Sequence, residues 1–122
     1  MGFDFGMKRI GVAVGQKVTQ TASGLTVVQA CDGIPKWEQL DKLILDWQPE
    51  KFIVGLPLNM DGSKSEMSQK ANKFSRRVSS RYDIPSEMFD ERLTSFEARE
   101  HEEKTHIDAI AAKLILESWL RE

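Results

Sequence analysis

The order of the apolar segments is the feature that most constrains the fold of this chain. Three short apolar segments, at 1–5, 10–14 and 25–28, follow one another with little room between them for a helix. This spacing predicts three consecutive strands in an antiparallel meander. A helical segment at 35–47 and a fourth strand at 51–56 come next, and a strand–helix–strand order favours a parallel crossover. The sequence therefore predicts a mixed sheet.

The second half of the chain continues the alternation of helices and strands. Its predicted elements are a helix capped by Ser63 or Ser65, a short strand after 84–89 that ends at the cluster 90–92, a helix starting at Thr94 or Ser95, and a last helix over about Ile107–Leu120. We expect residues 1–122 to form one α/β domain. Its mixed sheet should have five strands, the first three antiparallel, with helices at its flanks.

Composition excludes several classes of protein. With 40% hydrophobic and 30% charged residues, the chain has the composition of a soluble globular domain. No apolar run approaches a membrane span and no signal-peptide pattern opens the chain, so we expect a cytoplasmic protein without a membrane partner. Cys31 is the only cysteine, which rules out an intrachain disulfide and a cysteine-rich zinc site. A net charge of −2 argues against indiscriminate coating of nucleic acid.

A local concentration of positive charge interrupts this acidic balance. Between residues 64 and 81 the chain has six basic residues and a single acidic residue, Glu66. Four of the basic residues recur along one side of the predicted helix, namely Lys70, Lys73, Arg77 and Arg81. This basic ridge is either a solvated face or a surface that contacts nucleic acid. The tryptophans at 37, 47 and 119 fit apolar helix stripes, so we expect them to pack in the core.

Three acidic residues lie where apolar segments begin or end. Asp4 ends the first predicted strand, Glu91 follows the last one, and Asp108 lies in the first turn of the final helix. Three converging carboxylates suit a magnesium-dependent phosphodiester hydrolase, because hard cations take oxygen ligands and can activate water. Adjacent strand residues point to opposite faces, so we expect only one of the pair 90–91 to be a ligand. We choose Glu91, with Asp90 as its rival. Taken singly, a turn explains Asp4 and a helix dipole explains Asp108.

Four ordered motifs cover nearly the whole chain. They lie at 3–13, 54–63, 90–99 and 108–117, and three of them contain one of the acids just described. Together they resemble the YqgF/RuvX family of the ribonuclease-H-like superfamily. The expected order of elements, with an acid at the end of the first strand, also resembles that superfamily. The resemblance implies a ribonuclease-H-like fold with Asp4, Glu91 and Asp108 as catalytic, metal-binding acids for Mg²⁺ or Mn²⁺.

The family resemblance also implies a nuclease that acts on structured RNA or branched DNA. The first expected activity is processing of the 5′ end of pre-16S rRNA, with a pre-ribosomal particle as partner. The alternatives are a Holliday junction resolvase and a non-catalytic nucleic-acid-binding factor. A monomer suits the RNA activity, whereas a resolvase needs a symmetric homodimer. Besides the basic ridge, the candidate phosphate contacts are Lys8, Arg9 and Arg92, with Asn59 in a loop that can equally be a plain turn.

Two departures from the family pattern bear on activity. The segment 100–106 is shorter than the family's usual loop before the last aspartate. In addition, the predicted fourth strand carries no acid at 54–56, where resolvases of the superfamily have one, so the acidic pair 90–91 must supply that ligand. A nucleotide-phosphate binder of the sugar-kinase type would need two such domains, which this length disfavours.

Overall fold

The computed structural model of the chain describes residues 1–57, 61–91 and 104–122, with side chains from residue 108 onward in the last range. The elements are β1 (Gly2–Asp4), β2 (Arg9–Gln16), β3 (Thr21–Cys31), β4 (Ile34–Pro35), α1 (Trp37–Trp47), β5 (Phe52–Leu56), α2 (Glu66–Tyr82), β6 (Ser86–Asp90) and α3 (Lys104–Leu120). None of the helices in these ranges is long and apolar enough to cross a membrane. The candidate residues Asn59 and Arg92, and the helix start predicted at 94–95, lie outside the described residues.

The sheet is mixed, as predicted. Its strand order is β4-β3-β2-β1-β5-β6, with antiparallel pairing from β4 to β1 and parallel pairing from β1 through β5 to β6. The meander and the parallel crossovers are therefore confirmed. The described strands number six rather than the expected five. The difference is β4, which lies at the edge of the sheet.

The additional strand comes from a tight hairpin that the sequence analysis missed. Asp32 and Gly33 both have positive φ angles, 51° and 79°, as the two central residues of a type I′ turn require. The turn folds β4 back onto the end of β3. Pro35, predicted to lie in the following helix, instead ends β4, and an edge strand tolerates a residue without an N–H group. The helix begins two residues later, at Trp37.

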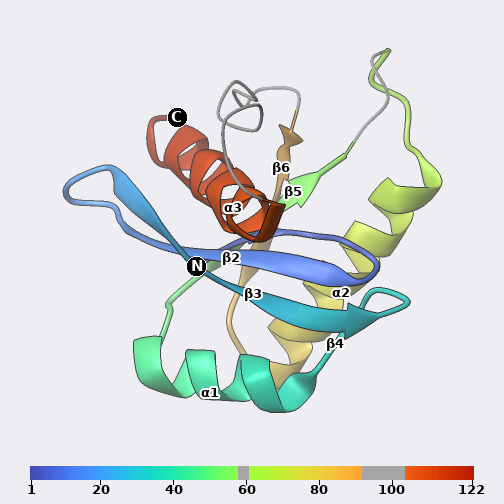
Figure 1. Cartoon of the computed structure of the whole chain (residues 1–122). Coiled ribbons are helices and arrows are strands. Elements are labelled where there is room, and N and C mark those ends of the chain that lie inside the picture. Colours follow the sequence, from blue (N-terminus) through green and yellow to red (C-terminus); the bar gives the residue numbers. More distant parts are fainter. Residues whose placement is uncertain (58–60, 92–103) are drawn as a thin grey trace.

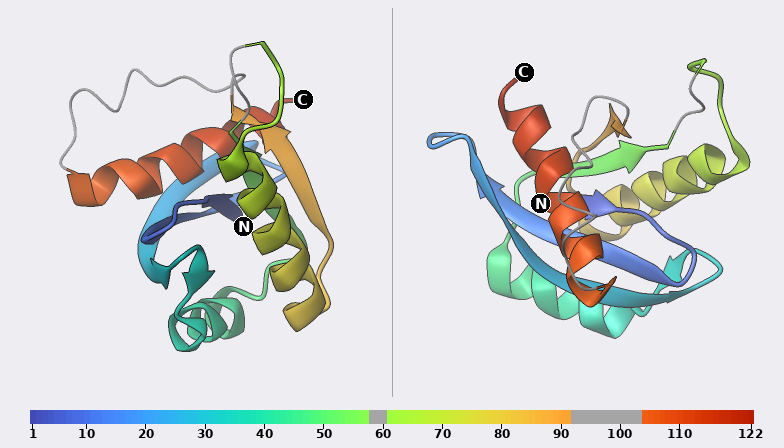
Figure 2. Two further views of the ribbon diagram at one scale, coloured as in Figure 1. Left: turned by 90° about the vertical axis from the view of Figure 1, so that its right-hand side faces the viewer. Right: turned by 45° about the horizontal axis from the view of Figure 1, so that its top comes forward.

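Helices cover both faces of the sheet. Figures 1 and 2 show α3 lying across one face, while α1 and α2 lie on the other. The core under α1 and α2 is aromatic, with Phe74 packing edge-on against Phe3 at a centroid distance of 5.3 Å. The core under α3 is separate and is made mainly of small and aliphatic side chains: Ala13, Ala22, Ile53, Phe89, Ala112, Ile115, Leu116 and Leu120.

Two helix starts and one tryptophan refine the sequence predictions. Ser65, not Ser63, is the N-cap of α2, and it exchanges hydrogen bonds with Ser68 in a capping box. Helix α3 begins at residue 104, three residues earlier than expected. Trp47 is 50% exposed at the last residue of α1, so the expectation that it packs in the core is wrong. The helix contacts the core through residues nearer its middle, including the buried Leu40.

Candidate active site

Asp4 lies at the end of β1, on the face of the sheet that α3 covers. Two residues earlier, Gly2 is so close to this helix that a Cβ atom there would lie 2.9 Å from Cβ of Leu116. Because strand side chains alternate, Asp4 is on the same face as Gly2. Asp4 pairs with Gly11 on β2, and cross-strand partners share a face. The half-buried carboxylate of Asp4 is therefore directed to the α3 side.

A glycine beside Asp4 allows the first turns of α3 to rest on the sheet. A Cβ atom at Gly11 would lie 1.9 Å from the carbonyl oxygen of Asp108 and 2.4 Å from its carbonyl carbon. No side chain fits in that space, so glycine at this position lets the helix backbone touch β2. The contact brings Asp108 over the strand next to Asp4. Two of the three predicted acids thus belong to one corner of the structure.

A second glycine makes room for Glu91. The parallel register of β1 and β5 pairs Phe3 with Val54, so the next position along β5, Gly55, lies beside Asp4. A Cβ atom at Gly55 would lie 2.5 Å from Oε1 of Glu91, which means that the Glu91 side chain folds over this glycine. Glycines therefore flank Asp4 on both neighbouring strands. The backbone of Asp108 contacts Gly11, and the side chain of Glu91 contacts Gly55.

The register of β6 separates Glu91 from its rival. Phe89 packs in the core under α3, whereas Met88 packs against the core under α1 and α2. By alternation Asp90, which pairs with Leu56, is on the α2 face. Glu91, which lies just past the end of the strand, is the member of the pair that shares the α3 face with Asp4.

Asp108 has an unusual electrostatic environment. Its Oδ2 atom lies 3.3 Å from Nε of Arg9, and the two side chains are 23% and 39% exposed respectively. The same Oδ2 atom is buried, and within the described part of the chain it has no hydrogen-bond partner. A buried oxygen with an ion-pair neighbour but no hydrogen bond is a costly arrangement that a bound cation would relieve.

Oxygen donors of this kind fit a hard divalent cation in their chemistry. Among the described residues, no three histidine, cysteine or acidic side chains are close enough together to form a ready-made metal site. The acids therefore share a face and a corner without forming a closed cluster. Arg9 lies against the carboxylate of Asp108, so a metal ion held by all three acids would require this ion pair to loosen.

The candidate phosphate-binding residues divide into two groups. Lys8 is exposed in the turn between β1 and β2, and Arg9 begins β2, so both lie at the end of β1 where the acids gather. The basic ridge belongs to α2, which covers the opposite face of the sheet (Figure 2). Lys70 is also partly neutralised by Glu66, 3.7 Å away. The described residues thus do not place the ridge beside the acids.

Sequence reasoning missed the two glycines that build this corner. Gly11 and Gly55 each interrupt an otherwise apolar strand, and a glycine inside a strand often marks a close approach of another backbone or group. That signal was available, but it names neither the group that approaches nor the face involved. Both answers depend on contacts between segments that are far apart in the sequence.

The comparisons with known proteins agree with this architecture. The fold is ribonuclease-H-like. It is similar to "T. thermophilus RuvC in complex with Holliday junction substrate", with a TM-score of 0.59 and 16% identity over 98% of this chain and 90% of that chain. The sequence matches the family "RuvX: Holliday junction resolvase" over residues 1–122, and the chain belongs to that family. Membership confirms the expectation of a hydrolase acting on phosphodiester bonds.

Curated relatives are similar over almost their whole length. A "Putative pre-16S rRNA nuclease" of Saccharophagus degradans is 50% identical, covering all of this chain and 92% of the relative. A protein of the same name from Glaesserella parasuis is 48% identical and is covered to 95%. The first alignment spans 131 residues whereas this chain has 122, so at least nine positions of that relative have no counterpart here.

Proposed function

We propose that this protein is a metal-dependent nuclease that processes the 5′ end of pre-16S rRNA. The observation that supports the proposal is that Asp4, Glu91 and Asp108 lie at one corner of the same sheet face. Glu91 and Asp108 each contact a glycine on a strand next to Asp4. The names of the curated relatives support an RNA substrate. In this proposal, residues 1–122 act as one cytoplasmic domain, with structured RNA in a pre-ribosomal particle as partner.

The mechanism assigns the three carboxylates to the binding of Mg²⁺ or Mn²⁺. When bound, such an ion supplies an activated water and stabilises the charge that develops on the leaving oxygen. Asp4 would be a ligand with a fixed position, because it lies on a central strand between two partner strands. Asp108 contributes a buried oxygen that lacks a hydrogen bond within the described residues.

Arg9 and Lys8 supply positive charge on the substrate side of the acids. In the structure the Arg9 guanidinium lies against Asp108, where it partly balances the negative charge of the corner. A phosphate that arrives at the site offers Arg9 a second anionic partner with matching fork geometry. We propose that Arg9 turns from the carboxylate to the phosphate when substrate and metal bind. Lys8 is exposed in the adjacent turn and positions the RNA strand through its phosphates, without reading its bases.

A Holliday junction resolvase is the second candidate, because the family description names that activity. A resolvase must cut two strands symmetrically, and this requires a two-fold dimer with the same surface on both subunits. An RNA-processing enzyme needs no such symmetry and can work as a monomer. The two candidate substrates therefore imply different oligomeric states, and we propose the monomer.

The test compares the wild-type protein with Asp4→Asn on two labelled substrates, in Mg²⁺ and in Mn²⁺. One is an RNA with a 16S 5′ leader, and the other is a synthetic four-way DNA junction. We expect the RNA to be cut by the wild type only, because the substitution removes a ligand charge while keeping the shape of the side chain. Circular dichroism and RNA binding of Asp4→Asn should match the wild type.

Three other outcomes would contradict the proposal. Paired nicks in the junction, with intact RNA, would establish the resolvase. Binding of either substrate without cleavage would establish a non-catalytic nucleic-acid-binding factor. Full activity of Asp4→Asn would remove this residue from the metal site.

A further inference from the structure

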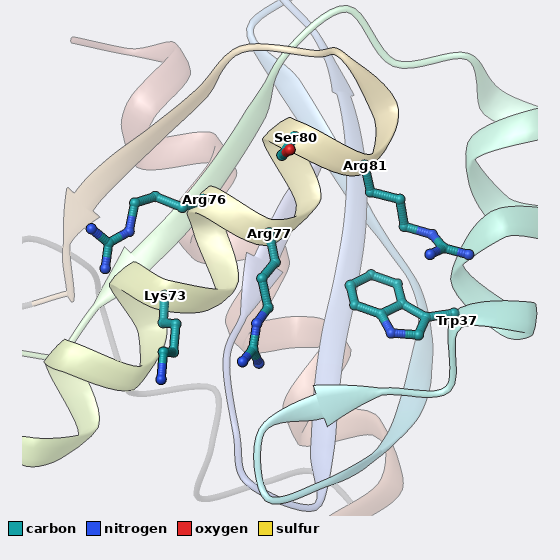
Figure 3. A pocket seen from close by; sticks show the side chains of 6 residues that line it. All are labelled: Trp37, Lys73, Arg76, Arg77, Ser80 and Arg81. Carbon is teal, nitrogen blue, oxygen red and sulfur yellow. The ribbon is translucent and has the colours of Figure 1, made fainter.

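A basic surface lies on the opposite side of the sheet from the acids. A surface pocket of about 610 Å³ lies where α1 meets the second half of α2 (Figure 3), and it is lined by Trp37, Lys73, Arg76, Arg77, Ser80 and Arg81. Only three of these belong to the basic ridge that the sequence predicted. The tryptophan comes from a different helix, and Arg76 and Ser80 widen the pocket beyond the ridge.

One wall of this pocket is held rigidly. Arg81 donates two hydrogen bonds to the carboxylate of Asp41, at 3.0 and 2.9 Å, and its guanidinium lies 4.6 Å from the centre of the Trp37 ring. The Tyr82 hydroxyl donates to the same carboxylate at 2.6 Å. These hydrogen bonds, that of Arg81 foremost, lower the pKa of Asp41 below its ordinary value. Arg81 therefore has a fixed position in the pocket wall, and Asp41 already balances its charge.

The other three cations of the pocket are not balanced. Lys73, Arg76 and Arg77 are exposed, and none of them forms an ion pair with the described residues. Arg76 and Arg77 follow Lys73 by three and four residues on one helix, a spacing at which like charges destabilise each other. Figure 3 shows Lys73 and Arg77 extending to the same side of α2, with Arg77 between Lys73 and Trp37. A bound polyanion would remove this repulsion, and arginine forks match phosphate oxygens well.

We propose that this pocket is a second binding site for the phosphate groups of a nucleic-acid strand, remote from the acidic corner. The inference rests on the proposed nuclease function, since it assigns the strand to the same substrate. Helix α2 starts beside the end of β5, and its pocket residues lie 7 to 15 residues from its first residue, or about 10 to 22 Å along the helix. A stacked strand advances about 3.4 Å per nucleotide, so roughly three to six nucleotides cover this length of helix.

The test uses the salt dependence of RNA binding, measured in an Asp4→Asn background so that no RNA is cut. The pocket variant is Lys73→Gln with Arg77→Gln. The control variant is Lys17→Gln with Arg121→Gln, which removes the same charge from exposed positions of the hairpin and the end of α3. Each protein is titrated with one long RNA, of about 24 nucleotides, which is long enough to reach both sites.

For the long RNA, we expect the slope of log K against log salt concentration to fall by about 1.4 in the pocket variant, the value for two lost single-strand phosphate contacts. The control variant should keep the parent slope. A melting temperature equal to that of the parent would show that the pocket variant is folded.

The proposal is overturned if the slope for the long RNA is the same in the pocket variant and the control. A parallel titration with ATP distinguishes binding of the phosphates of an RNA strand from binding of the phosphates of a free nucleotide. If Lys73 and Arg77 are needed for ATP binding but leave the RNA slope unchanged, the pocket belongs to a free nucleotide and the proposal is wrong. If the slope falls while the wild type cuts no RNA, the pocket stands and the nuclease function fails.

Discussion

The contact between Gly11 and the first turns of α3 gives the sharpest structural prediction. In Gly11→Ala, the new methyl group would lie 1.9 Å from the carbonyl oxygen of Asp108. That oxygen is part of a helix backbone and cannot rotate away, so α3 must move by about 1 Å, and a displacement of that size in an active site can cost about 100-fold in rate. We expect a loss of about 3 kcal/mol in the free energy of unfolding, the upper part of the usual range for overpacking.

The measurements are urea unfolding, extrapolated to zero denaturant, and the rate of RNA cleavage. Gly24→Ala is the matched control, because a Cβ atom at Gly24 faces the same helix but lies 3.0 Å from the carbonyl oxygen of Ala109. We expect it to cost less than about 1 kcal/mol. If Gly11→Ala unfolds within about 0.5 kcal/mol of the wild type and cleaves normally, α3 is not seated on β2 in the way described.

Three further predictions test other parts of the structure. Gly55→Ala should push the Glu91 carboxylate aside, since the methyl group would lie 2.5 Å from Oε1 of Glu91 and 2.6 Å from Cδ1 of Ile115. Cleavage should fall while RNA binding and the melting temperature persist; normal cleavage would contradict the placement of Glu91. Phe74→Ala should cost about 3–5 kcal/mol in urea unfolding because it empties the centre of the aromatic core, and a cost below about 1 kcal/mol would be incompatible with that packing. Asp41→Asn should lower the melting temperature at neutral pH, where the folded protein holds Asp41 ionised beside Arg81 with a lowered pKa; this difference should disappear in calorimetry as acid protonates Asp41, and a gap that persists in acid would refute the ion-pair explanation.

Much of the fold followed from the local sequence pattern. The meander and the crossover were predictable because the first strands leave no room for helices and the later ones are separated by a full amphipathic helix. Strand β4 was missed because two residues are too few to show any periodicity. The Asp32–Gly33 pair that turns the chain there was nevertheless a recognisable hairpin signal.

The residues of the candidate site could be proposed from the sequence, but their arrangement could not. The three acids could be picked out, and alternation separated Asp90 from Glu91, but only the strand register shows which of the two faces α3. The ridge on α2 was also visible as a helical pattern. Its position on the far side of the sheet was not, because no helical pattern specifies which face of a sheet the helix will cover. The role of Asp41 as the partner of Arg81 likewise depends on two helices meeting.

The most direct test of the proposed active site is Mn²⁺ binding, followed by electron paramagnetic resonance, in the wild type, Asp4→Asn and Asp90→Asn. Asp90→Asn is the control because its side chain is on the opposite face of the sheet from Asp4. The account predicts a bound Mn²⁺ in the wild type and in Asp90→Asn, and more than a tenfold loss of affinity in Asp4→Asn. Equal affinity in Asp4→Asn and the wild type, or loss of binding in Asp90→Asn alone, would contradict the assignment of the metal site to the α3 face.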